Sequence, residues 1–153
     1  MGRIMVLMVM LQLFCGLQLA MARGNEATET EVRQGFEQIL DLWRDGRYEE
    51  LYERTSGGRM TREAFSRHFA DAALKPNCCW DKLQEVTVTV HTGSRATLHG
   101  TVGLESAVGS ETKTKTFKLT KERGVWRVSQ SELTSLAGAS TKKKRKRVLL
   151  TKP

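Results

Sequence analysis

Alternation of apolar and polar side chains dominates residues 82–130. Valines occupy every second position in residues 86–91, and the alternation returns at 95–104, 116–120 and 125–129. A period of two is typical of a strand that buries one face. Short segments rich in Gly, Ser and charged residues separate the runs. The block therefore predicts four consecutive strands of an antiparallel sheet, which any fold of this chain must accommodate.

The first two strands indicate their own register. A three-residue loop at 92–94 pairs His91 with Arg95, and it keeps apolar side chains opposite apolar ones along both strands. The matched pairs are then Val90 with Ala96, Val88 with Leu98, Thr89 with Thr97 and Thr87 with His99. Both histidines fall on the polar face, so we expect them to point away from the helices.

The last two strands also indicate how they pair. A four-residue turn pairs Leu119 with Trp126 and Phe117 with Val128, again apolar against apolar. The connection at 105–111 is expected to be a looser loop. The predicted inner face of the sheet consists of Val86, Val88, Val90, Ala96, Leu98, Val102, Phe117, Leu119, Trp126 and Val128.

Before the strands, apolar residues recur at helical spacing. The first helix is predicted from a cap at Thr30, the second over residues 48–54, and the third from a cap at Thr61 up to Pro76. The apolar positions are Val32, Phe36, Ile39, Leu40 and Trp43 in the first helix, and Phe65, Phe69, Ala72 and Ala73 in the third. Three helices followed by four strands predict an α+β domain with the helices on one face of the sheet.

The excess of positive over negative charge lies at the two ends of the chain. The net charge is +8, from 25 basic and 17 acidic residues. Arg3 and seven residues of the C-terminal tail account for this excess, and no acidic residue lies beside them. Acidic and basic residues are equal in number in the rest of the chain, and this balance does not support a folded nucleic-acid-binding face.

The N-terminal segment has the pattern of a secretory signal. Arg3 precedes an apolar run at 4–19, and Ala20-Met21-Ala22 provides small residues for cleavage after Ala22. The run is short for a membrane span, although an uncleaved anchor is the alternative. We therefore divide the chain into a signal peptide (1–22), a polar lead-in (23–29), a domain (30–135) and a flexible basic tail (136–153), and expect a periplasmic or secreted protein.

The tail contains one uninterrupted basic run. It consists of Lys142, Lys143, Lys144, Arg145, Lys146 and Arg147. Such a run is typical of a solvated tail, and it also suits contact with an anionic membrane or wall polymer. The same letters resemble a nuclear-import signal, which the predicted export route argues against.

Two of the three cysteines are adjacent. Cys15 lies in the predicted signal, while Cys78 and Cys79 precede the first strand. We expect a buried pair of thiols; a vicinal or intermolecular disulfide is the alternative in an oxidising compartment. No further Cys or His lies at ligand spacing, so neither a metal site nor a cofactor is predicted.

Three segments carry a family resemblance. They are Asp-Gly-Arg-Tyr-Glu-Glu-Leu-Tyr at 45–52, Met-Thr-Arg-Glu-Ala-Phe at 60–65 and Gly-Val-Trp-Arg-Val at 124–128. Together with the long first helix they resemble the nuclear-transport-factor-2-like superfamily over residues 30–133. The resemblance implies a cone, in which a curved sheet wraps around helices and leaves a pocket, and a core-packing role for Trp126. The superfamily includes ketosteroid isomerases, polyketide cyclases, dehydratases, transport factors and exported bacterial proteins.

The predicted inner face offers little chemistry. No Asp, Glu or His falls on it, whereas proton-transferring enzymes of this superfamily need an acid or base inside the cone. Lys115 and Gln130 have inward parity and pair in the predicted register, where they could meet a polar or anionic ligand. The candidate ligand pocket is therefore lined by Trp43, Tyr52, Trp80, Lys115, Trp126 and Gln130.

These features predict an exported, non-catalytic domain that binds a small ligand or a protein. One alternative is a pocket enzyme of the ketosteroid-isomerase or cyclase type; another is association of the tail with an anionic surface. The Thr-rich outer face of the sheet is a candidate homodimer surface.

Overall fold

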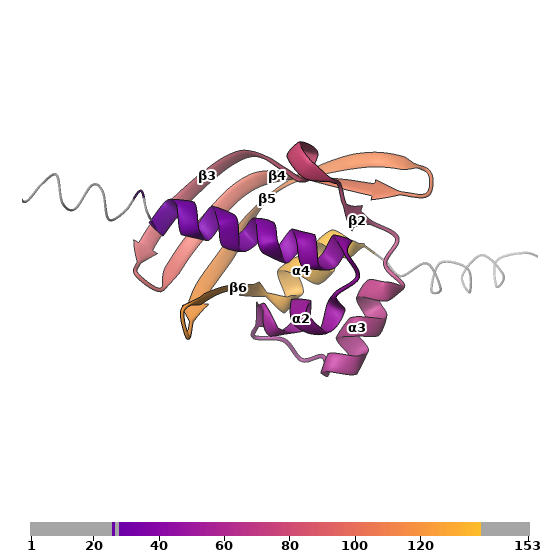
Figure 1. Cartoon of the computed structure of the whole chain (residues 1–153), viewed down its shortest axis with the longest axis horizontal. Helices are drawn as coiled ribbons and strands as arrows, with labels where there is room; N and C mark the ends of the chain where they lie inside the picture. The colour runs from indigo at the N-terminus through magenta and orange to yellow at the C-terminus, as the bar shows by residue number, and fades with distance from the viewer. Residues whose placement is uncertain (1–25, 27, 139–153) are drawn as a thin grey trace, which may run out of the picture.

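The structure is a computed structural model, which describes residue 26 and residues 28–138 (Figure 1). The predicted signal peptide and the basic run at 142–147 lie outside the described residues, so their roles stay predictions from the sequence. Within the described part, no helix is both long and apolar enough to cross a membrane.

Helices and strands follow one another along the chain, and the strands form a curved sheet. The first helix spans residues 28–44. The other helical elements are α2 (Tyr48–Glu53), α3 (Arg62–Ala70), a 3₁₀ turn η1 (Cys79–Lys82) and α4 (Gln130–Ala137). The strands are β1 (Thr55–Ser56), β2 (Lys75–Pro76), β3 (Leu83–Thr92), β4 (Arg95–Ser106), β5 (Gly109–Glu122) and β6 (Val125–Ser129).

All six strands join one mixed sheet. The strand order is β1-β6-β5-β4-β2, and β3 also pairs with β4. Strand β3 pairs with β4 between residues 95 and 102, and β2 pairs with residues 104–105 of β4. Among the strand pairs of the described residues, only β1–β6 is parallel. The first helix lies across the strands of the long hairpins, and α2 and α3 lie together near its C-terminal end, with α2 alongside the helix (Figure 1). The expected α+β cone is confirmed, with one more helix and two more short strands than predicted.

The first hairpin keeps four of the predicted pairs, but the predicted pairing of His91 with Arg95 is wrong. Val88 faces Leu98 and Val90 faces Ala96, as expected. However, β3 continues to Thr92, which pairs with Arg95, so the turn has two residues rather than three. A register shift between Val90 and Thr92 accommodates the extra residue. A bulge of this kind lets a tight turn coexist with an intact apolar face.

The second hairpin is shifted by two residues. Leu119 pairs with Val128, and Glu122 pairs with Val125, so the turn consists of Arg123 and Gly124 alone. Both turn residues have positive φ, 52° and 81°, as the common two-residue hairpin turn requires. A shift of two leaves every side chain on its own face, which is why alternation alone could not detect it.

The connection at 105–111 is a tight hairpin and not the predicted loose loop. Ser106 pairs with Gly109, and its hydroxyl accepts from the backbone N–H of Val108 at 3.3 Å. The first half of β5, residues 109–116, is exposed or half-buried throughout. A strand that is exposed to solvent on both faces carries no alternating apolar pattern, so no periodic signal predicts it.

Two further local predictions are corrected. Thr30 lies inside the first helix, where its hydroxyl donates to the carbonyl of Glu26 at 3.1 Å. Thr61 is the N-cap of α3 as predicted, and accepts from Ala64 N at 3.3 Å. This helix ends at Ala70, so the predicted continuation through residues 72–73 is wrong.

The chain after β6 forms a helix that the sequence reading did not identify. Leu133, Leu136 and Ala137 are its buried face, together with Gln130 at its start. Eight residues with three apolar positions give a weak periodic signal. The folded part therefore reaches residue 137, two residues beyond the predicted domain.

A single core joins the first helix, α2, α3, α4 and the inner face of the sheet. The rings of Phe36 and Phe117 are 4.5 Å apart, and Trp43 meets Phe69 edge-on at 5.1 Å. Trp126 is 3% exposed, in agreement with the expected packing role. The valines of β3 on the predicted inner face are only half-buried because β3 is an edge strand.

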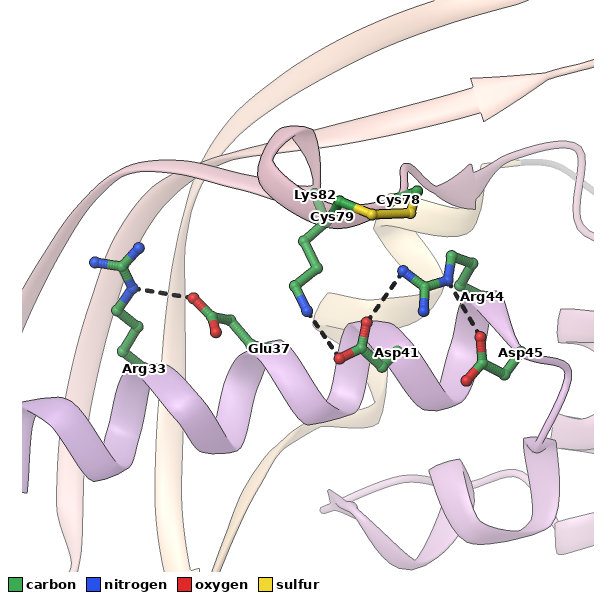
Figure 2. A network of polar contacts seen from close by, with 8 residues as sticks. All are labelled: Arg33, Glu37, Asp41, Arg44, Asp45, Cys78, Cys79 and Lys82. Atoms are coloured by element: carbon green, nitrogen blue, oxygen red, sulfur yellow. Dashed lines mark hydrogen bonds and ion pairs between the residues drawn. A yellow bond between two sulfur atoms is a disulfide. The ribbon is translucent and has the colours of Figure 1, made fainter.

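The two cysteines are not a buried thiol pair. Cys78 and Cys79 are both exposed and are joined in a vicinal disulfide at the start of η1 (Figure 2). The second interpretation of these residues is therefore the one that the structure supports. Trp80 follows directly and is 88% exposed.

Candidate functional site

The predicted pocket residues do not form one site. Trp43 and Trp126 are buried in the core, and Trp80 points outward from η1. Lys115 pairs with Gly100 across β4 and β5, and its ammonium group contacts the hydroxyl of Ser135. The expected pairing of Lys115 with Gln130 is wrong because β6 ends before Gln130, which begins α4.

Tyr52 and Gln130 are the two predicted residues that share a cavity. This cavity has a volume of about 280 Å³ and is lined by the end of β1 and the start of the loop that follows it, at residues 55–58. Gln130 is 4% exposed, and its Oε1 accepts from Met60 N at 3.1 Å. The hydroxyl of Tyr52 donates to the carbonyl of Met60 at 3.4 Å. Both side chains thus hold the loop in place.

A larger cleft, of about 620 Å³, lies where the edge of the sheet meets the first helix and α2. We call it the α2–β6 cleft. It is lined by Gln38, Asp41, Leu42, Arg47, Glu50, Glu53, Arg54, Glu122, Arg123, Val125 and Arg127. None of the predicted pocket residues is in this lining. Glu53, Glu122 and Arg127 also line the smaller cavity, so the two spaces adjoin.

The carboxylate of Asp41 is held from outside the cleft. Lys82 of η1 donates to its Oδ2 at 2.8 Å, and Arg44 lies 3.3 Å from its Oδ1 (Figure 2). The Lys82 side chain is 16% exposed, so this pair is better shielded from solvent than the neighbouring Arg33–Glu37 pair. The contact ties η1 to the first helix at the wall of the cleft.

The other three acids of the cleft also have cationic partners. Arg47 donates to Glu50 at 2.5 Å, Arg127 lies 3.2 Å from Glu122, and Glu53 pairs with Arg62 of α3. The hydrogen bond from Arg47 is the main reason that the pKa of Glu50 lies below its usual range. Every acid in the cleft is therefore matched by a basic group.

Arg54 differs from the other groups of the cleft. Its Nη2 donates to the neutral amide oxygen of Gln38 at 2.5 Å, and no carboxylate of the described residues lies within ion-pair distance. Burial lowers the pKa of Arg54, and the positive charge of Arg127 lowers it further. The Nε of Arg127 is buried and lacks a hydrogen-bond partner among the described residues.

We expect the Glu50 carboxyl to titrate closer to its ordinary pKa of 4.5 in Arg47→Gln, because the hydrogen bond that stabilises its charged form is lost. Because the pKa of Glu50 is lowered in the folded state, the Arg47–Glu50 pair stabilises the fold at pH values above the unfolded-state pKa. This stabilisation is lost as the pH falls through the folded-state pKa. Carbon-detected NMR titration of the side-chain carboxyl measures this. Glu63, whose pKa is lowered by its own backbone and Thr61, is the internal control and should not change. An unchanged Glu50 titration would contradict the pairing.

The histidines of the sheet occupy the predicted outer face. His91 and His99 are exposed, and each ring contacts a threonine hydroxyl, that of Thr97 at 2.7 Å and that of Thr116 at 3.0 Å. Among the described residues, no group of three or more His, Cys, Asp or Glu is arranged to hold a metal ion.

Comparison with known proteins supports the fold. No family profile matches the chain, and no curated protein matches its sequence. A solved structure of a candidate scytalone dehydratase from Novosphingobium aromaticivorans superimposes with a TM-score of 0.53, at 9% identity over 70% of this chain and 83% of that one. An NTF2-like protein with a cystatin-like fold from the same species scores 0.48 at 18% identity, covering 72% and 82% of the two chains. An NTF2-like protein of unknown function from Pseudomonas putida scores 0.49 at 16% identity, covering 67% and 82%.

These likenesses concern the fold and no more. The superposition at a TM-score of 0.53 shows that this chain shares its fold with the candidate scytalone dehydratase. At identities this low, an activity does not follow from a shared fold.

Sequence reasoning did not find the α2–β6 cleft. Its residues come from three separate places, namely 38–42, 47–54 and 122–127. A charged residue on a short helix usually indicates a solvated face. The structure shows that Leu51 is the one buried residue of α2, so the other side chains of this helix are free to line the cleft.

Proposed function

We propose that this chain is a non-catalytic binding domain that takes up a small molecule in the α2–β6 cleft. The observation that supports this best is the cleft itself. Its volume of about 620 Å³ lies within the range of roughly 300–1,000 Å³ typical of small-molecule sites. Leu42 and Val125 give it apolar wall, and fixed arginines give it polar anchors.

The chemistry of the interior favours binding over catalysis. The buried polar side chains of the described residues are Thr55, Thr101 and Gln130, none of which titrates near neutral pH. Proton transfer of the ketosteroid-isomerase kind uses a carboxyl or imidazole whose pKa is shifted by burial. The carboxylates of the cleft are instead held in ion pairs with arginines and a lysine, which suits recognition of a ligand.

The proposal predicts that filling the cleft abolishes ligand uptake. Gln38 is exposed on the first helix and lines the cleft, so Gln38→Trp should occupy part of it. Gln34 lies one turn earlier, is also exposed and is outside the lining, so Gln34→Trp is the matched control. In thermal-shift measurements with anionic, neutral and cationic small molecules, at least one compound should stabilise the wild type and Gln34→Trp but not Gln38→Trp.

Two results would contradict the proposal. One is that no compound of any charge class stabilises the wild type. The other is that a stabilising compound acts equally on Gln38→Trp, which would place its site elsewhere.

A further inference from the structure

We propose that the ligand of the α2–β6 cleft is an organic anion whose carboxylate or phosphate group is bound between Arg54 and Arg127. This inference rests on the proposed function and makes its ligand specific.

The backbone places the two arginines side by side. Strand β1 runs parallel to β6 with Thr55 opposite Val128, and Val128 N donates to the carbonyl of Arg54 at 3.1 Å. Arg54 and Arg127 therefore precede paired residues on adjacent strands. Both side chains line the cleft, and the charge of Arg127 is close enough to act on Arg54.

Pairing within the cleft leaves a positive charge in excess. Its four acids are each engaged by a basic group, and two of them, Asp41 and Glu53, are engaged by residues outside the lining. Of its four arginines, Arg47 and Arg127 have a carboxylate partner, whereas Arg54 and Arg123 have none among the described residues. An anion entering the cleft would thus meet Arg54, for which no acid competes. It would also meet Arg127, whose Nη1 pairs with Glu122 but whose Nε has no partner among the described residues.

The arrangement has an electrostatic cost that an anion removes. The positive charge of Arg127 acts unfavourably on Arg54, and burial removes part of the water around the Arg54 guanidinium. Arg127 also keeps a buried Nε donor that no described residue accepts from. A guanidinium has five N–H donors in a planar fork, which matches the oxygens of a carboxylate or phosphate.

The cleft is larger than the anionic group alone. Leu42 on the first helix and Val125 at the start of β6 lie in the same lining, where they can cover an apolar ligand body. The ligand therefore combines an anionic head with an organic remainder, which excludes a free inorganic ion as the preferred occupant.

Four probes with one ring and different charges test this inference. Phenyl phosphate and benzoate carry the anionic groups, benzamide is neutral and benzylamine is cationic. Isothermal titration of the full chain should show binding of one or both anions, and weaker or no binding of the other two. Comparing phenyl phosphate with benzoate shows which anionic group is preferred.

Variants then locate the anion. Arg54→Gln should weaken binding on the order of tenfold or more, because a charge-assisted hydrogen bond is lost, and Arg54→Lys should recover part of it. Arg33→Gln makes the same change of charge on the first helix outside the lining and should bind as the wild type does. The basic tail is common to all variants, so any anion binding by the tail cancels in this comparison.

The outcomes separate the inference from the proposed function. If benzamide binds as well as benzoate, or Arg54→Gln binds the anions as tightly as Arg33→Gln, the anion assignment is wrong. If such binding is nevertheless lost in Gln38→Trp, the cleft is still a ligand site and the proposed function stands. If no probe binds in a way that depends on Gln38, the anion assignment and this cleft as the binding site both fail.

Discussion

The Gly103→Ala variant is expected to unfold at a temperature lower by on the order of 10 °C. Gly103 lies on β4 at the point between its pairings with β3 and β2, where η1 crosses the strand. A Cβ atom at this position would lie 2.0 Å from the backbone oxygen of Asp81 and 3.0 Å from the side-chain nitrogen of Asn77. Such overpacking typically costs about 1–3 kcal/mol and sometimes more.

The atom that the new Cβ would clash with belongs to the backbone of η1, which cannot shift without disturbing other contacts. Asn77 N donates to the carbonyl of Gly103 at 2.9 Å, so lifting η1 away from β4 strains the bond beside it. It would also withdraw Lys82 from Asp41, which connects η1 to the wall of the α2–β6 cleft (Figure 2). We therefore expect Gly103→Ala to impair ligand uptake as well as stability.

A glycine in the neighbouring turn provides the control. Gly93, between β3 and β4, has nothing within 4 Å of the position that a Cβ would take. Gly93→Ala should change the free energy of unfolding by less than about 0.5 kcal/mol, as most open surface substitutions do. Thermal unfolding followed by circular dichroism compares the two. Equal melting temperatures for both variants would mean that η1 does not cross β4 as closely as described.

The hairpins show what alternation can predict and where it stops. Period two assigns each side chain to a face, and the buried positions Leu98, Phe117, Leu119 and Val128 were predicted correctly. It does not distinguish registers that differ by two residues, so Leu119 was paired with Trp126 and not with Val128. The turn geometry decides between them, here through the positive φ of Arg123, which no sequence pattern indicated.

The candidate site was harder to predict than the sheet. Arg54 and Arg127 are 73 positions apart in the numbering and become neighbours only because the short strand β1 pairs with β6. Two residues, Thr55 and Ser56, make up that strand, which is too short for any periodic signal. The predicted pocket instead used aromatic residues such as Trp43, whose spacing is equally that of a helix face in the core.

Removing an aromatic ring from the core should also lower the stability of the protein strongly. Phe36 is 0% exposed on the first helix, and its ring centroid lies 4.5 Å from that of Phe117 on β5. Phe36→Ala removes the ring that joins the helix to the concave face of the sheet. The expected loss is about 3–5 kcal/mol, the range found for buried Phe→Ala substitutions. The free energy of unfolding of a single domain is roughly 5–15 kcal/mol, so this variant should retain only a small part of its stability at room temperature.

Urea denaturation measures this loss as a lower midpoint at an unchanged slope. Gln34→Ala, an exposed change on the same helix, controls for the effect of alanine on helix stability and should lie within about 0.5 kcal/mol of the wild type. Phe36→Leu keeps most of the buried volume and should cost less than Phe36→Ala. If Phe36→Ala were no less stable than Gln34→Ala, the first helix would not pack on the sheet, and the α2–β6 cleft would lose the wall that Gln38 and Leu42 provide.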